Sequence, residues 1–418
     1  MTPARMILLG VGWFGVQVFW AFHTASMPLF LADLAGSKFR VSLVLSLAGI
    51  SGVLVPPIVG YLSDRTYARF GRRAPYVCSG MLGVLVCVLA LPHTTTLGSA
   101  ALLSGLMYFS LRTAETPFLS LLPDITPREQ RATASGVMNL LGSIGLILCF
   151  VAGSLVWERN PSAMFTLVAT VPFGLTLICL VLIGEPAAQR GPAADPLGAW
   201  AYLQGLARER NVLRYLVAQF FWWLGFWMIS SFLVLFVAEE LEVAEGRSFL
   251  VPLAFSVVAT AAMLPMGMLG DHFGRKAILT RMIALWAVLG VALGLSRSLA
   301  ETLVAVGLSG IPFAAVMAVG YAFFLDLIPE ERTAEFVGIG ILTIAGAQFV
   351  GPLIGGQLID SLGYRSLFPV AAAFQLVGVL LLQLVRPARA APAPPPASHG
   401  PGPHGGCAGR APKGAAEQ

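Results

Sequence analysis

The chain has 418 residues, of which 57% are hydrophobic and 11% are charged. A soluble domain carries about 25% charged residues, so these charges are too few to cover a soluble surface, and lipid must cover much of it. The formal net charge of +5 comes from basic residues in short loops, unlike the one-sided basic patch of a nucleic-acid-binding protein. Composition therefore predicts a protein of the lipid bilayer without a nucleic-acid partner.

Twelve apolar segments are long enough to cross a bilayer as a helix, which takes about 20 residues. They span residues 7–32, 42–62, 76–92, 98–122, 132–156, 163–184, 214–238, 249–270, 277–296, 301–325, 334–359 and 364–385. Backbone polar groups in lipid must be hydrogen-bonded within their own segment, so the predicted fold class is an all-α membrane protein. The first segment is too long for the apolar part of a signal peptide, and we expect it to remain as a spanning helix.

Lysine and arginine are unevenly distributed between the two sides that these helices define. Nineteen of them lie on the side of both termini and of the loops that follow even-numbered helices, and six lie on the other side. Arg112 lies inside a helix. Because cytoplasmic loops are enriched in Lys and Arg, we expect a multi-pass protein of the cell membrane with both termini in the cytoplasm.

Several short patterns in the first half of the chain return in the second half, 202 to 207 positions later. The matching pairs are Gln17 and Gln219, Gly60 and Gly267, Asp64 and Asp271, Arg72 and Arg275, and Asp124 and Asp326. Such a repeat indicates two duplicated six-helix halves with a cavity where they meet. A large protein of this kind works by rocking one half against the other.

The repeat divides the chain into an N-terminal half, residues 1–184, and a C-terminal half, residues 214–385. A polar connection, residues 185–213, is expected to lie between them on the cytoplasmic side. The last segment, residues 386–418, is rich in Pro, Ala and Gly and cannot bury a core, so it is expected to be a disordered cytoplasmic tail.

A specific resemblance appears in the loop between the second and third segments. There Gly60 and Asp64, followed by the basic run Gly71-Arg72-Arg73, resemble the signature of the major facilitator superfamily, and the second half carries it too. In the first half, residues 66–69 lengthen this loop. The longer form is similar to that of the sucrose/proton symporters and related glycoside transporters, as are Gln17 and Trp20 in the first segment and Leu121-Leu122-Pro123-Asp124 in the fourth. The resemblance implies two pseudo-symmetric six-helix halves.

The repeated aspartates end helices on the expected cytoplasmic side, where a carboxylate can face a helix N-terminus or a loop arginine. By resemblance they belong to a cytoplasmic gate that breaks during alternating access. The gate residues are Gly60, Asp64, Arg65, Arg72, Arg73, Asp124, Gly267, Asp271 and Arg275. The alternative is that the basic residues only set the topology. Recurrence of both Gly and Asp favours the gate, because topology needs basic residues alone.

Arg112 and Glu115 are charged residues deep inside the fourth segment, and their i, i+3 spacing places them on one helix face. A lone charge at the middle of a membrane costs at least about 2.5–3.5 kcal/mol, which an ion pair and a polar cavity reduce. In the functional interpretation Glu115 takes up a proton or binds a substrate hydroxyl, and Arg112 tunes it or contacts substrate. In the structural interpretation the pair fastens the fourth helix to a neighbour.

The sequence leaves two alternatives for coupling to protons. The sucrose symporters carry an acid about two turns before the proline of the fourth helix, and Tyr108 occupies that place here. Tyrosine does not exchange protons near neutral pH, so either Glu115 replaces that acid or coupling is absent. His23 is a second titratable candidate, either as a packed neutral residue or as a proton relay.

Two helices carry aromatic and amide residues along one stripe. The stripe residues are Trp13, Gln17, Trp20 and Thr24 in the first segment and Gln219, Trp223, Phe226 and Ser230 in the seventh. A ring beside an amide suits a sugar, because the ring stacks on the C–H face and the amide pairs with hydroxyls. The alternative is ordinary packing or an interfacial aromatic belt. Asn139 and Gln348 are expected to form interhelical hydrogen bonds.

The sequence therefore predicts a secondary transporter of a small polar organic solute such as a sugar or glycoside, monomeric, and either coupled to protons or not. It carries no nucleotide-binding loop and no nucleophile–base or metal constellation, so neither an enzyme nor a cofactor is expected. His399, His404 and Cys407 in the tail match no metal-ligand spacing. The alternatives are an exporter of amphipathic compounds and a membrane assembly factor that does not transport.

Overall fold

The computed structural model describes residues 2–66, 71–184, 209–328 and 333–386, without the side chains of residues 128, 132 and 333–335. The expected connection lies outside the described residues except for 209–213, and so does the expected tail except for Arg386.

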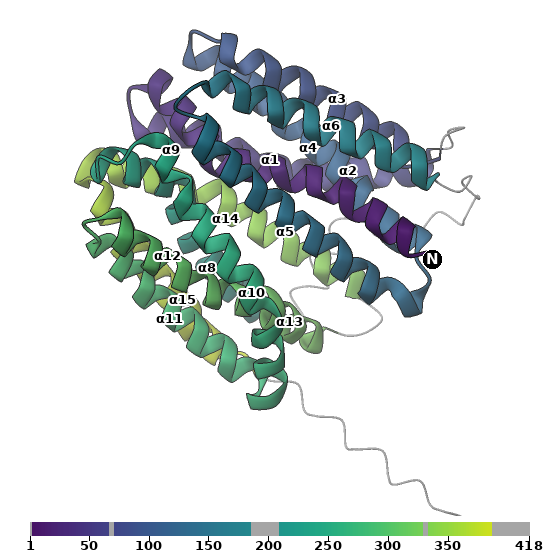
Figure 1. Cartoon of the computed structure of the whole chain (residues 1–418). Helices are drawn as coiled ribbons and strands as arrows, with labels where there is room; N and C mark the ends of the chain where they lie inside the picture. The colour runs from purple at the N-terminus through teal and green to yellow at the C-terminus, as the bar shows by residue number, and fades with distance from the viewer. Residues whose placement is uncertain (1, 67–70, 185–208, 329–332, 387–418) are drawn as a thin grey trace, which may run out of the picture.

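The N-terminal half consists of six helices, drawn in purple to teal in Figure 1. They are α1 (Pro3–Ala35), α2 (Lys38–Arg65), α3 (Ala74–Ala90), α4 (Leu97–Ile125), α5 (Arg131–Val156) and α6 (Pro161–Ile183). Ser37 and Thr96 accept hydrogen bonds from the amides of Arg40 and Ser99, which fixes where α2 and α4 begin. Gly36 ends α1 in the left-handed conformation with φ 67°, which a glycine adopts without strain.

The C-terminal half repeats this arrangement with more breaks, in green to yellow in Figure 1. Its helices are α8 (Arg210–Leu235), α9 (Glu245–Ser248), α10 (Leu250–Phe273), α11 (Arg275–Leu295), α12 (Leu299–Ala315), α13 (Tyr321–Leu327), α14 (Thr333–Leu362) and α15 (Leu367–Gln383). A π-helical turn, Phe236–Glu240, continues α8, and another, Val316–Gly320, joins α12 to α13. The expected all-α class with its repeated halves is confirmed.

Eleven of the described helical segments are long and apolar enough to cross a membrane. The remaining long helix, α4, contains 29 residues and is made less apolar by Arg112, Glu115 and several hydroxyl residues. Because α4 packs along α2 and α3 in the same half, these polar groups face protein rather than lipid alone.

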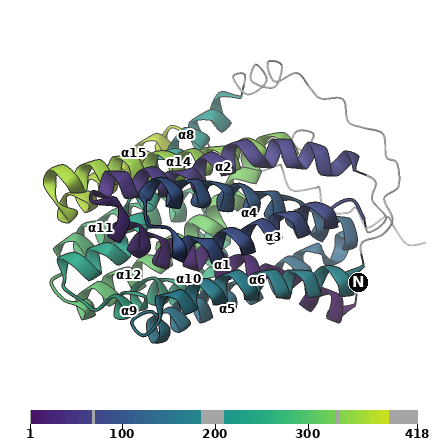
Figure 2. The ribbon, with the colours of Figure 1, turned by 90° about the horizontal axis from the view of Figure 1, so that it is seen from above.

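The two halves meet through α2 packed along α14 and α5 packed against α10, which Figure 2 shows for the first pair. We call the end of the bundle that carries Pro3 and Arg386 the terminal end, and the end that carries the turns at Gly36 and Gly363 the distal end. At the distal end, a Cβ on Gly356 of α14 would lie 2.6 Å from the backbone oxygen of Lys38. The helices are therefore in backbone contact there.

The space around α2 changes from the middle of the helix toward its terminal end, as far as the described residues show. Halfway along, a Cβ on Gly49 would lie 2.3 Å from the backbone nitrogen of Phe349, so the helices still touch. At Gly60, near the terminal end, an added Cβ would meet nothing within 4 Å, and the same holds for Gly136 on α5. The described residues therefore place the halves in backbone contact at Lys38 and Gly49, and leave open space at Gly60 and Gly136.

Candidate functional site

An ion pair between the half-buried Arg112 and the buried Glu115 lies in α4 where the two halves face each other. Arg112 Nη1 donates to Glu115 Oε2 at 2.7 Å, as the i, i+3 spacing predicts. Trp20 Nε1 on α1 donates to the other carboxylate oxygen, Glu115 Oε1, at 3.2 Å. Both oxygens of Glu115 therefore accept a hydrogen bond.

Arg112 also reaches the opposite half of the protein. Its Nη2 donates to Gln348 Oε1 on α14 at 3.3 Å, and its guanidinium lies 4.6 Å from the ring centroid of Trp20. The expected interhelical hydrogen bond of Gln348 is thus present, whereas Asn139 donates only to Ser135 of its own helix among the described residues. One arginine consequently connects α1, α4 and α14.

Two buried donors in this cluster have no hydrogen-bond acceptor among the described residues. They are Nε of Arg112 and Nε2 of Gln348, which come from opposite halves. A buried donor without an acceptor is destabilising, by about 1–3 kcal/mol. Such groups are commonly satisfied by water or a ligand, so these two donors mark a place where an oxygen-bearing ligand is favourable.

His23 and Tyr108 form a second buried pair beside Trp20. The Nδ1 atom of His23 lies 2.7 Å from the hydroxyl of Tyr108, and both side chains are buried. The rings of Trp20 and His23 meet edge to face with centroids 5.4 Å apart. No local pattern pairs these residues, since 85 positions separate them. Whether His23 relays protons stays a prediction.

The remaining stripe residues lie in different surroundings. Gln17 is half-buried on α1 and makes no hydrogen bond with the described residues, so its amide is available to a ligand. The amide nitrogen of Gln219 is already engaged, donating to the backbone oxygen of Gly340 at 2.8 Å and to Thr343 at 2.9 Å. Trp223 is buried in an aromatic cluster with Phe226 and Phe313. In this state Gln219 and Trp223 therefore contact other residues of their own half, as the packing alternative predicts.

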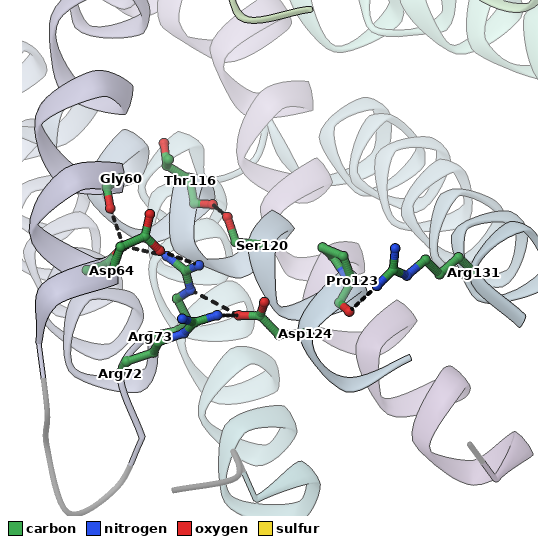
Figure 3. Close-up of polar contacts among 10 residues, drawn as sticks. Gly60, Asp64, Arg72, Arg73, Thr116, Ser120, Pro123, Asp124 and Arg131 are labelled. Atoms are coloured by element: carbon green, nitrogen blue, oxygen red, sulfur yellow. Dashed lines mark hydrogen bonds and ion pairs between the residues drawn. The ribbon is translucent and has the colours of Figure 1, made fainter. Parts of the chain in front are cut away.

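The expected gate residues of the N-terminal half converge at the terminal end (Figure 3). Arg73, at the start of α3, pairs with Asp64 of α2 at 2.7 Å and with Asp124 of α4 at 3.2 Å. It also donates to Ser63 at 2.7 Å, and Arg72 adds a 2.7 Å contact to Asp124. This cluster ties three helices of one half together.

The C-terminal half has a corresponding cluster, in which one arginine contacts both acids. Arg275 pairs with Asp271 of α10 at 3.0 Å and with Asp326 of α13 at 2.7 Å. Although Arg275 aligns with Arg72 in the repeat, it reproduces the contacts of Arg73. Arg65, the remaining expected gate residue, instead contacts the hydroxyl and ring of Tyr61.

The ion pairs at the terminal end join helices within a half, and those among the described residues do not bridge the halves. Gly60 and Gly267 lie one turn before the paired aspartates, with open space at Gly60 and only Ala318 of the same half, at 4.0 Å, near Gly267. A glycine at such a position leaves room for a neighbouring helix to approach closely. The gate role of these glycines stays a prediction.

The family model described as the Major Facilitator Superfamily matches residues 9–260 and 215–415 of the chain. The sucrose transport protein SUC4 of Arabidopsis thaliana is 25% identical over 34% of this chain and 31% of its own length. Solute carrier family 45 member 3 of Macaca fascicularis is 26% identical over 79% of this chain and 71% of its own. A Na(+), Li(+), K(+)/H(+) antiporter of Planococcus maritimus is 31% identical over 41% of this chain and 42% of its own length. The alignments with SUC4 and with the sucrose transport protein SUT1 of Oryza sativa span less than half of those proteins.

Solved transporter structures share the fold. The nucleoside transporter NupG superposes with a TM-score of 0.76 at 14% identity, over 91% of this chain and 99% of that one. A bacterial homolog to the human lysosomal transporter Spinster, in an inward-facing and occupied conformation, superposes with a TM-score of 0.74 at 13% identity. The superposition covers 91% of this chain and 95% of that one. At these identities the likeness is one of fold. The resemblance to sucrose transporters that the loop motif indicated is confirmed by the curated relatives.

Proposed function

Because the chain belongs to the major facilitator superfamily, we propose that it is a secondary transporter that moves a small uncharged polar solute, a sugar or a glycoside, across the membrane. The observation that carries the proposal is the buried Arg112–Glu115 pair, hydrogen-bonded to Gln348 of the other half. A solute bound there touches both halves, so its binding can be linked to their relative movement.

The charge of the site favours an uncharged solute. Arg112 and Glu115 neutralise each other at 2.7 Å, so a carboxylate or ammonium group of a ligand would bring an uncompensated charge into a buried site. The unpaired donors of Arg112 and Gln348 instead suit the hydroxyl or ether oxygens of a sugar. The amide of Gln17, one helical turn before Trp20, adds a further partner for a hydroxyl.

We propose that protons are the coupling ion and that Glu115 carries them. Glu115 is buried in the middle of α4, and its carboxylate accepts hydrogen bonds from Trp20 and Arg112. Protonation requires Arg112 to leave Glu115, which a change in the contacts of Arg112 with Gln348 or with the solute would permit. Transport is therefore coupled to protons only if Arg112 leaves Glu115 at some stage of the transport cycle. If Arg112 stays paired with Glu115, the solute moves without a proton.

The proposed orientation places the terminal end in the cytoplasm of a cell-membrane protein, as the basic residues favour. The contacts at the distal end and the open space around Gly60 then correspond to an inward-open state. We propose that the chain works as a monomer, because each half finds its partner within the same chain.

Uptake by the full-length protein in proteoliposomes tests this proposal. The panel contains labelled sugars, glycosides, organic acids and monovalent cations, each with and without an imposed pH gradient. We expect uptake of at least one sugar or glycoside, lost in Arg112→Gln/Glu115→Gln and kept in Glu242→Gln, which removes an exposed carboxylate at the distal end. Uptake confined to charged solutes contradicts the proposed solute class, and no uptake of any solute favours the assembly-factor alternative.

A further inference from the structure

A carboxylate of the C-terminal half binds the first turn of a helix of the N-terminal half. Asp360, near the end of α14, accepts the backbone amide of Lys38 on Oδ1 at 2.8 Å and that of Phe39 on Oδ2 at 2.9 Å. The first turn of α2 contains no acidic residue of its own. The helix therefore takes from the opposite half the negative charge that a helix N-terminus favours.

The reciprocal contact occurs on the other side of the interface. Glu158, just after α5 of the N-terminal half, accepts the backbone amide of Gly246 in the C-terminal half at 3.2 Å. Beside it, Trp157 Nε1 donates to Glu245 at 2.6 Å. A Cβ on Gly246 would lie 3.0 Å from the side chain of Glu158, so the two segments are in close contact.

The two contacts are related by the internal repeat. Glu158 and Asp360 are 202 positions apart, the separation that also relates Asp124 to Asp326. Glu158 follows α5, and Asp360 lies near the end of α14, the counterpart of α5 in the repeat. Asp360 binds the start of α2, and Glu158 binds α9, which directly precedes α10, the counterpart of α2. The contact therefore occurs in both directions across the interface, at positions that the internal repeat relates.

Other charged groups at the distal end surround the Asp360 contact. The ammonium of Lys38 pairs with Glu239, which also accepts a hydrogen bond from the hydroxyl of Tyr364 at 3.0 Å. Arg365 pairs with Glu240 at 2.9 Å. These contacts hold α2, the π-helical turn after α8 and the residues just before α15 together. The amides of Lys38 and Phe39 are hydrogen-bonded to Asp360, so they exchange with water when that contact breaks.

We propose that Asp360 and Glu158 form a duplicated latch that holds the distal end closed, and that both contacts break together when that end opens. The proposal rests on the alternation between two states that the proposed function requires. Asp360 and Glu158 are in this sense positioning residues, which set the population of the closed distal end and do not touch the solute.

Hydrogen–deuterium exchange of the full-length protein without solute tests the latch. In Glu158→Gln, peptides that contain Lys38 and Phe39 should exchange about threefold faster than in the wild type, although Glu158 does not touch them. In Asp360→Asn the same acceleration should appear at Gly246. The double variant should accelerate exchange at both places by about tenfold, since independent contributions to one opening multiply. Glu242→Gln, an exposed carboxylate of the same end, should change neither place.

Acceleration confined to the amides next to each substituted residue would show two local helix caps and would overturn the proposal. Glu158 is exposed, so its substitution leaves helix packing intact and the remote readout at Lys38 can be measured even if Asp360 variants fold poorly. Because no solute is added, the result does not depend on which solute is transported. If Glu158→Gln accelerates exchange at Lys38 and Phe39 but the protein transports none of the tested solutes, the proposed function is contradicted and the latch is supported.

Discussion

Arg112 of α4 and Gln348 of α14 are joined by a 3.3 Å hydrogen bond between the two halves, midway between the distal contacts and the open terminal end. Arg112 is at the same time the ion-pair partner of Glu115. The side chain that pairs with the buried acid thus also contacts the opposite half. In the proposed function, binding of the solute and movement of the halves both act on this residue.

Removal of the Gln348 amide should weaken solute binding. Gln348→Ala eliminates a hydrogen-bond partner of Arg112 and one buried donor, and we expect KM for the transported solute to rise about tenfold, which corresponds to about 1.4 kcal/mol. The measurement is the concentration dependence of uptake in proteoliposomes. Gln357→Ala, an exposed amide on the same helix, is the matched control and should leave KM unchanged. An unchanged KM in Gln348→Ala would remove Gln348 from the site.

The two arginines of the terminal-end cluster should differ in their effect on stability. Arg73 is buried and binds Ser63, Asp64 and Asp124, whereas Arg72 is half-buried and binds Asp124. We expect Arg73→Ala to lower the free energy of unfolding by about 2 kcal/mol and Arg72→Ala by less than about 1 kcal/mol. Thermal unfolding in detergent measures both. Equal effects would contradict the central place of Arg73 in the cluster.

Asp64 and Asp271 should matter for turnover more than for folding. Both are exposed and hold an arginine within their own half, so Asp64→Asn and Asp271→Asn should insert and fold nearly as the wild type does. We expect the transport rate to fall by about tenfold in each, because the predicted gate assigns these clusters to closure of the terminal end. Asp33→Asn, an exposed change at the distal end, is the control. Wild-type turnover in both variants would exclude them from gating.

The orientation of the chain can be measured directly. A reporter that is active only outside the cytoplasm, fused after residue 388, should remain inactive, because the terminal end carries most of the basic residues. The same reporter placed at Gly363, in a distal turn, should be active. The reverse pattern would invert the topology and make the structure an outward-open state.

Much of the fold follows from the sequence alone, because a span needs only length, apolar composition and an internal backbone hydrogen-bond pattern. The pairing of Arg112 with Glu115 is also local, since i, i+3 spacing brings the two residues together on any helix. The contacts of Trp20 and Gln348 with this pair depend instead on how α1 and α14 pack, which no local pattern specifies. For the same reason Trp223, which shares a stripe with Gln219, lies in an aromatic cluster of its own half.

The most direct test of the account separates net accumulation from exchange in Glu115→Gln. The amide keeps the shape of the side chain but cannot release a proton, so we expect this variant to lose solute accumulation driven by a pH gradient while keeping solute exchange between the two sides. If the acid is only the structural partner of Arg112, the variant leaves a buried charge unpaired at a cost of about 3–5 kcal/mol, so it should fold poorly and lose both activities. Arg112→Gln/Glu115→Gln should then recover folding.

Accumulation and exchange are therefore measured side by side, in proteoliposomes of the wild type, Glu115→Gln and the double variant, after their folded yields have been matched. The account predicts a folded Glu115→Gln protein with exchange near the wild-type rate and no accumulation above the equilibrium level. A folded Glu115→Gln protein that still concentrates solute in response to the pH gradient would contradict it.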